Sequence, residues 1–311
     1  MNKLSILKEI KKIYEENGNV IAYLKRQDGR EFNSVEDIMI SYDFQAGTYV
    51  DAYQKNKQWN DAFTKRLASF ITKNGIRGGV LEAGIGEGTT LLSLLNKVKN
   101  HFTDIYGFDI SWSRMKVARE FLTQNGYLEA NLFVGDMFSI PLKTNSIDLV
   151  YTCHAIEPNG GHEKEILEEL YRVTKRYLIL LEPAYELAEE TARIRMKQHG
   201  YITNLYETAK NLNYEIEEYS LYGMSANIDN PTGFLVIRKK AFEDNEGYNP
   251  ICCPVTNAEL KKYNDAYFSK ESLLAYPILG GIPCLTKQAA IVATHYDESF
   301  VMRKPDVIEE L

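Results

Sequence analysis

The sequence has 311 residues, of which 44% are hydrophobic, and its formal net charge is −7. This length accommodates one large domain and a smaller one around a sizeable core. The acidic balance, without a long basic run, disfavours general nucleic-acid binding. The sequence lacks both the run of roughly 18 apolar residues that a membrane helix needs and the apolar core of a signal peptide. Four cysteines suit reduced thiols, so we expect a cytoplasmic protein.

The N-terminal 60 residues are predicted to form a helical cap. Residues 3–17 carry apolar side chains at helical spacing, which predicts an amphipathic helix. Residues 20–24 have the pattern of a short strand. Ser34 precedes two acidic residues and is expected to cap a further helix.

The rest of the chain is organised around residues 80–90, which predict a strand, a glycine turn and a helix. Gly84, Gly86 and Gly88 permit backbone angles that other residues resist. Such a unit brings backbone N–H groups to a ligand at the mouth of a sheet. The glycines follow a G-x-G-x-G pattern, not the G-x-G-x-x-G of dinucleotide sites, and Glu82 stands two residues before the first of them.

The segments around and after the glycine turn contain expected helix caps and a second acidic residue at a strand end. Thr89 and Thr90 are expected to cap the first helix, and Ser111 the second. Asp109 ends the second predicted strand, about 25 residues beyond Gly84, which is near the spacing of an acid that binds ribose hydroxyls.

These motifs, in this order, resemble those of the class I S-adenosylmethionine (SAM)-dependent methyltransferases, most closely the branch that acts on small molecules. The resemblance covers roughly residues 40–240. It implies SAM as cofactor, S-adenosylhomocysteine as product and no metal. It also implies that Glu82 contacts the methionyl part, Asp109 the ribose, and Asp136 with Met137 the adenine. The cofactor-binding residues implied in this way are Glu82, Gly84, Ile85, Gly86, Gly88, Asp109, Ile110, Asp136, Met137 and Cys153.

The predicted fold class is α/β, with a Rossmann-like, seven-stranded, mostly parallel sheet, an N-terminal helical cap and a small C-terminal α+β tail. Alternating strands and helices imply a parallel sheet with right-handed crossovers. We expect a cap and lid over residues 1–60, a SAM-binding domain over 61–242 and a tail domain over 248–311. Strands are expected near 79–83, 105–109, 131–134, 147–152 and 177–182, helices near 89–99, 111–124 and 162–175, and a hairpin-like pair at 214–221 and 233–238.

The segment just before the core resembles one that folds over SAM in small-molecule methyltransferases and closes the acceptor pocket. Tyr42, Gln45, Tyr49 and Tyr53 are therefore candidate lid residues. Ordinary helix packing is an equally weighted alternative for this segment.

Candidate catalytic residues follow the fourth and fifth strands. His154 is the first candidate for a base, because imidazole titrates near neutral pH. A histidine packed between sheet and helix is the alternative. Glu157 is a candidate for holding an amine or hydroxyl, and Glu182 leaves a buried strand at the ligand edge.

The tail resembles a small zinc-ribbon-like family, some members of which activate methyltransferases. Its Tyr-Pro-Ile and Gly-Ile-Pro segments are present, but of the four metal-binding cysteines only Cys253 remains. Thr256, Ser269 and Ser272 stand at about the other positions, and structural zinc needs four Cys or His ligands. The tail is therefore expected to be a metal-free remnant that packs on the main domain or mediates self-association.

The leading functional hypothesis is methyl transfer to an oxygen or nitrogen of a small molecule or glycan-linked precursor. One alternative is a protein of the same fold that binds SAM or a partner without catalysis. Another is a protein or RNA methyltransferase, suggested by the relatives of the tail. A small-molecule acceptor is the expected partner, nucleic acid and membranes are not expected, and a homo-oligomer remains open.

Overall fold

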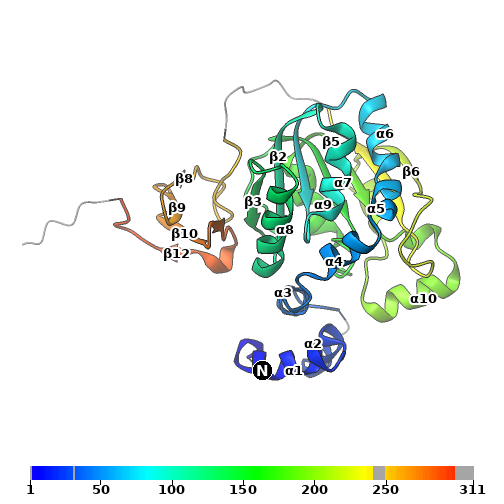
Figure 1. Cartoon of the computed structure of the whole chain (residues 1–311), viewed down its shortest axis with the longest axis horizontal. Helices are drawn as coiled ribbons and strands as arrows, with labels where there is room; N and C mark the ends of the chain where they lie inside the picture. The colour runs from blue at the N-terminus through cyan, green and yellow to red at the C-terminus, as the bar shows by residue number, and fades with distance from the viewer. Residues whose placement is uncertain (1, 31, 241–248, 298–311) are drawn as a thin grey trace, which may run out of the picture.

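A seven-stranded sheet forms the centre of the computed structural model, which describes residues 2–30, 32–240 and 249–297 (Figure 1). The strand order is β3-β2-β1-β4-β5-β7-β6. The first five strands are parallel, and β7 is antiparallel to both β5 and β6. This confirms the predicted Rossmann-like α/β fold and the hairpin-like pair. The strands are β1 (Gly78–Ala83), β2 (Phe102–Asp109), β3 (Asn131–Val134), β4 (Ile147–Cys153), β5 (Thr174–Leu181), β6 (Glu215–Leu221) and β7 (Gly233–Arg238).

The two faces of this sheet have separate apolar cores, because successive strand residues point to opposite faces. In β1, Val80 packs with the helices on one face, and Leu81 packs with those on the other. The first face carries α6 (Lys65–Lys73), α7 (Thr89–Val98) and α8 (Trp112–Gln124). The second carries α9 (Glu163–Val173) and α11 (Leu205–Asn211).

All regular elements of the described N-terminal segment are helices, so the prediction of a strand at 20–24 is wrong. Asn19 accepts the N–H of Ala22 at 3.0 Å, and Val20 and Leu24 pack against Ile10 at helical spacing. The predicted first helix is divided between a 3-10 turn and an α-helix. The elements are η1 (Lys3–Ile6), α1 (Leu7–Glu15), α2 (Val20–Gln27), α3 (Val35–Phe44), α4 (Thr48–Lys55) and α5 (Lys57–Phe63).

Two predicted helix caps have different outcomes. Ser34 forms a capping box with Asp37 at the start of α3, as expected. The prediction that Thr89 or Thr90 caps α7 is wrong, because Gly88 is the N-cap and no side chain caps this helix. The φ of Gly88 is 77°, which favours a residue without a side chain.

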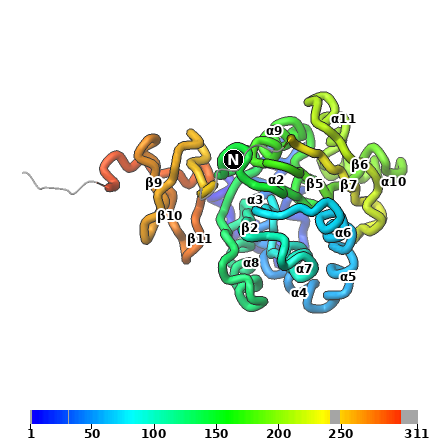
Figure 2. Tube along the Cα trace, turned by 90° about the horizontal axis from the view of Figure 1, so that it is seen from above, coloured from blue at the N-terminus to red at the C-terminus, as the bar shows by residue number. Residues whose placement is uncertain are grey.

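Between β5 and β6 the chain forms elements that the sequence analysis did not assign. They are η2 (Tyr185–Leu187), α10 (Glu190–His199) and α11. Helix α10 lies at the side of the molecule where β6 and β7 end the sheet (Figures 1 and 2).

The tail forms a small sheet that packs against the opposite edge of the main sheet, beside β3 (Figures 1 and 2). Val134 of β3 pairs with Cys284, and Leu142 pairs with Ile251. The linker expected near 243–247 and the tail residues after 297 lie outside the described residues. The tail elements are β8 (Lys261–Lys262), β9 (Ala266–Ser269), β10 (Leu274–Leu279), β11 (Ile282–Pro283), η3 (Lys287–Ala289) and β12 (Ile291–Val292).

Among the residues that the structure describes, no helix combines the length and the apolar character that crossing a membrane requires.

Candidate functional site

Two adjoining cavities lie where the carboxyl ends of β1, β2 and β4 meet the helical cap. Both are lined by Tyr49, Gly84, Arg114 and His154. The first extends past the ends of β2 and β3, and the second extends under α4 and α5 towards α10. This edge is where open α/β sheets bind ligands.

The glycine turn after β1 brings the backbone close to both cavities. The N–H groups of Gly84 and Ile85 both donate to the carbonyl of Phe108, at 2.9 Å. Gly84 has a φ of 72°, and a Cβ at this position would lie 2.4 Å from the Cβ of Ala155 and 2.6 Å from the Cε of Met137. Only glycine fits there.

Asp109 holds the turn and the next helix together at the end of β2. Its two carboxylate oxygens accept the N–H of Gly86 at 3.0 Å and the N–H of Ser111 at 2.9 Å. Ser111 also caps α8, as predicted. Burial raises the pKa of Asp109, and the nearby charge of Arg114 opposes this rise.

The far end of the first cavity is formed by residues that follow β2 and β3. Asp136, Met137 and Ile110 all line it. One carboxylate oxygen of Asp136 accepts the N–H of Phe138 at 2.9 Å, and burial raises the pKa of this carboxyl group.

Glu82 and Cys153 line the second cavity from the ends of β1 and β4. The Glu82 carboxylate accepts a hydrogen bond from the hydroxyl of Tyr151 at 2.9 Å. Burial raises the pKa of Glu82 to about 8 and also raises that of the Cys153 thiol. All the cofactor-binding residues implied by the sequence line a cavity except Gly88, which begins α7 against Leu122.

The candidate lid lies over both cavities. Tyr42 lines the first, Tyr53 the second, and Tyr49 both, whereas Gln45 lines neither. The amide of Gln45 instead donates to the carbonyl of Ser41 at 3.1 Å.

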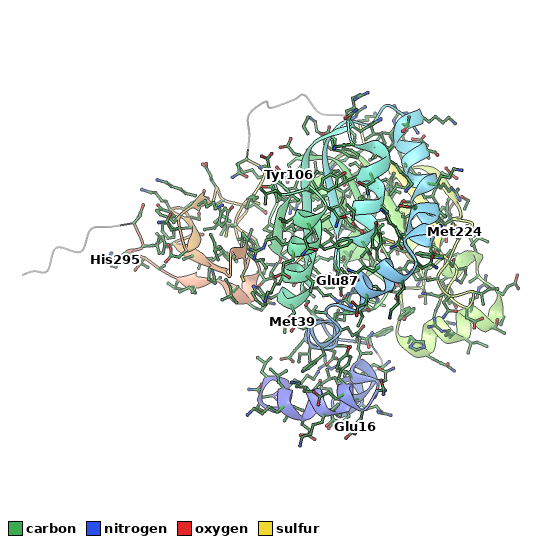
Figure 3. All side chains as sticks on the ribbon, viewed as in Figure 1. Glu16, Met39, Glu87, Tyr106, Met224 and His295 are labelled. Carbon is green, nitrogen blue, oxygen red and sulfur yellow. The ribbon has the colours of Figure 1, made fainter. Side chains whose placement is uncertain are left out.

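A glutamate of the glycine turn holds the lid in place, which the sequence analysis missed. Glu87 lies at the contact between the cap and the sheet (Figure 3). Its carboxylate accepts the N–H of Gly47 at 2.8 Å and that of Val50 at 2.7 Å. A second acid, Asp43, accepts the hydroxyls of Ser111 and Ser113 and so joins α3 to α8.

Arg114 is a second residue that the sequence analysis missed. It is only 4% exposed, and its guanidinium lies 4.5 Å from the ring centroid of Tyr42 and 4.7 Å from that of Tyr49. Its Nε donates to the carbonyl of Tyr42 at 3.0 Å, and its Nη2 is buried without a partner. A signal was available, because an arginine in the first turn of a helix opposes the helix dipole.

His154 is held by both ring nitrogens. Its Nδ1 donates to the carboxylate of Glu157 at 2.8 Å, and its Nε2 lies 2.7 Å from the hydroxyl oxygen of Thr232. Burial alone would lower the pKa of His154, but the hydrogen bond and charge of Glu157 outweigh it and raise this pKa. The same Glu157 oxygen accepts the amide of Asn230 at 3.1 Å. The histidine and glutamate thus join the loop after β4 to the loop before β7.

Glu182 lies behind the site and lines neither cavity. Its carboxylate accepts three backbone N–H groups, from Ala155, Ile156 and Glu157, at 3.0 to 3.2 Å. Burial raises its pKa to about 7. The structure therefore gives Glu182 a positioning role: it fixes the loop that carries His154 and Glu157.

The outer wall of the second cavity comes from α10 and the residues after it. Arg195 and Tyr201 line this wall. Their side chains interact with each other, because the Arg195 guanidinium lies 5.8 Å from the Tyr201 ring centroid. No motif in the sequence marks either residue.

Four tail positions correspond to the metal-binding cysteines of the related family. Two of them, Thr256 and Ser272, lie beside a third, Cys253. Its sulfur lies 3.6 Å from the hydroxyl of Ser272 and 3.1 Å from that of Tyr276, and it receives a hydrogen bond from Thr256. Ser269 accepts the N–H of Ser272. Within the described ranges, no three His, Cys, Asp or Glu side chains are placed to hold a metal ion.

Part of the sequence, and the fold, are similar to those of known proteins. Residues 80–177 match the family model described as a methyltransferase domain. A magnesium protoporphyrin IX methyltransferase from Synechocystis PCC 6803, crystallised with S-adenosylhomocysteine, is 13% identical, with a TM-score of 0.50 over 65% of this chain and 99% of that one. A SAM-dependent methyltransferase from Aquifex aeolicus is 18% identical, with a TM-score of 0.42 over 60% and 97% of the two chains. No curated protein matches the sequence.

Proposed function

We propose that the protein is a class I SAM-dependent methyltransferase that transfers a methyl group to an oxygen or nitrogen of a small molecule, because residues 80–177 match the family model of a methyltransferase domain. The observation that carries this proposal is the meeting of Glu82, Asp109 and Asp136 at one glycine turn. Such acids recognise three groups of SAM, namely the ammonium, the ribose and the adenine. Along the two cavities, Glu82, Asp109 and Asp136 follow one another in that order.

The cofactor would lie across both cavities. Asp136 and Met137 would border the adenine in the first cavity, and Asp109 would accept the ribose hydroxyls. The methionyl part would pass over Gly84 into the second cavity, where Glu82 faces its ammonium. When bound, SAM supplies an electrophilic methyl group on a sulfonium.

We further propose that Arg114 binds the carboxylate of the cofactor. A Cβ on Gly86 would lie 3.6 Å from Nη1 of Arg114, so this guanidinium is close to the path of the methionyl part. The unpartnered Nη2 then gains an acceptor, and the two tyrosine rings fix the guanidinium plane.

The remaining part of the second cavity would hold the acceptor. Methyl transfer from a sulfonium is an in-line displacement, so the protein must align the acceptor and exclude water. Tyr49 and Tyr53 in the lid serve that purpose. The His154–Glu157 pair is proposed to take the proton that the acceptor oxygen or nitrogen loses, and Glu182 keeps the pair in place.

Calorimetric titration with SAM and with S-adenosylhomocysteine tests the proposal. Both should bind with one site per chain. A folded wild-type protein that binds neither compound at about millimolar concentration would refute the proposal.

A further inference from the structure

Buried polar atoms without partners gather around the second cavity. Most buried polar groups in proteins are hydrogen-bonded, so such atoms at a cavity indicate where a ligand supplies the missing partners. Of the side chains with an unpartnered buried atom in the described part of the chain, four line this cavity. The atoms are Tyr53 Oη, Arg114 Nη2, Arg195 Nη1 and Asn230 Oδ1.

Two of these residues lie away from the glycine turn. Arg195 belongs to α10, and Asn230 belongs to the loop between β6 and β7. Neither lines the first cavity, where the adenine is placed. Their unpartnered atoms therefore lie outside the part of the site proposed for the adenine.

Arg195 offers a positive charge that the protein does not neutralise. Among the described residues it has no carboxylate within ion-pair distance, and its Nη1 is buried. Glu157 lines the same cavity, but its carboxylate oxygen Oε2 is already shared by His154 and Asn230. The guanidinium interacts with Tyr201. Burial lowers the pKa of His199, and the charge of Arg195 lowers it further. A buried guanidinium N–H in this setting lacks an acceptor, and an anionic oxygen is the strongest one.

Asn230 has a buried acceptor atom that lacks a donor. It is 7% exposed, and its Nδ2 donates to Glu157, which as a carboxylate only accepts. This bond fixes the orientation of the amide. The buried Oδ1 then has no hydrogen-bond donor from the protein.

We propose that the methyl acceptor carries a carboxylate or phosphate that binds Arg195, and that Asn230 Oδ1 accepts a hydrogen from its hydroxyl or amine. This inference rests on the proposed function, whose cofactor occupies the other end of the cavities. It narrows the acceptor to a small anion that also has an O–H or N–H group close to the His154–Glu157 pair.

The experiment measures ligand binding to protein saturated with S-adenosylhomocysteine. The probes are 4-hydroxybenzoate and 4-hydroxyphenyl phosphate as anions and 4-hydroxybenzyl alcohol as their uncharged counterpart. The variants are Arg195→Met, Arg195→Lys and, as a matched control, Lys197→Met, which removes one positive charge from the same helix outside both cavities. Affinity for S-adenosylhomocysteine, which should be unchanged in all of them, shows that each variant is folded.

The anions should bind at least tenfold more tightly than the alcohol, and this preference should disappear in Arg195→Met, persist in part in Arg195→Lys and remain in Lys197→Met. Whichever anion binds more tightly identifies the class of acceptor. Equal binding of the anions to wild type and Arg195→Met, or no binding of any anion, would overturn the inference. Anions that displace S-adenosylhomocysteine would also overturn it, because they would occupy the cofactor's own carboxylate site. If S-adenosylhomocysteine itself does not bind, the proposed function fails.

Discussion

The carboxylate of Glu87 in the glycine turn accepts the N–H of Val50 in α4 at 2.7 Å. It also accepts the N–H of Gly47, the residue before this helix. One side chain of the glycine turn thus satisfies two orphan donors at the start of the candidate lid helix. Since the turn and the lid border the same cavity, cofactor binding and lid order are expected to be coupled.

We therefore predict that Glu87→Gln loosens the lid. The amide has a single acceptor oxygen, so one of the two N–H groups loses its partner and the other loses a charge-assisted bond, which contributes about 1.5–3 kcal/mol. Amide hydrogen exchange at Gly47 and Val50 should become roughly tenfold faster. Glu120→Gln, on an exposed part of α8, is the control for loss of charge and should leave these amides unchanged. Unaltered exchange in Glu87→Gln would show that the lid is held by its packing alone.

A second prediction compares the two acids of the first cavity. Asp109→Ala should weaken binding of S-adenosylhomocysteine roughly 10- to 100-fold, because two ribose hydroxyls lose a buried carboxylate and the glycine turn loses its bond at Gly86. Asp136→Ala should cost less, because a single adenine contact is lost. Calorimetry, with thermal unfolding to check the fold, measures both. Equal or reversed losses would contradict the assignment of these residues.

The third prediction is that cofactor binding releases a proton near pH 7. Burial raises the pKa of Glu82 to about 8, so its carboxyl group is mostly protonated at pH 7. The ammonium of the ligand favours the carboxylate and lowers this pKa, which expels the proton. Affinity should therefore rise with pH up to about 8 and then level off.

The measurement is the calorimetric enthalpy of S-adenosylhomocysteine binding in phosphate and in Tris, whose ionisation enthalpies differ. The enthalpies should differ between the buffers for wild type and much less for Glu82→Gln. Proton uptake by the wild type, or a release that persists in Glu82→Gln, would assign the effect to another group.

Much of the fold could be predicted because its signals are local. Apolar runs, glycines with positive φ and the Ser111 cap each depend on a few consecutive residues. The sequence predicts a strand at residues 20–24 because the isolated apolar run fits either element, and only packing on Ile10 decides for the helix.

The site was only partly predictable, because its key contacts join residues that are far apart in the sequence. Arg114 meets Tyr42, and Asn230 meets Glu157, only once the sheet has formed. Glu182 has the position of a strand-end acid, but its carboxylate is used by the neighbouring backbone. Sequence position alone does not distinguish such an acid from one that faces the ligand.

The last prediction is that the tail carries no zinc. Cys253 stands where the related pattern has its first ligand, but the groups around it are the hydroxyls of Thr256, Ser272 and Tyr276. Burial alone would raise the pKa of Cys253, but hydrogen bonds from these hydroxyls outweigh it and lower this pKa. The hydroxyl donors thus surround the sulfur where metal ligands would be needed, and one thiolate cannot complete a structural zinc site.

Elemental analysis of protein purified without added metal should find far less than one zinc per chain, and a chelator should leave the unfolding temperature unchanged. Cys253→Ala should lower that temperature by a few degrees, because the buried hydroxyl of Tyr276 and the hydroxyls of Thr256 and Ser272 lose their sulfur partner, at a cost of about 1–3 kcal/mol. Stoichiometric zinc, together with a fall in the unfolding temperature on chelation, would show that other residues complete the coordination sphere. In that case the tail would be stabilised by its metal and not by the hydroxyl groups around Cys253.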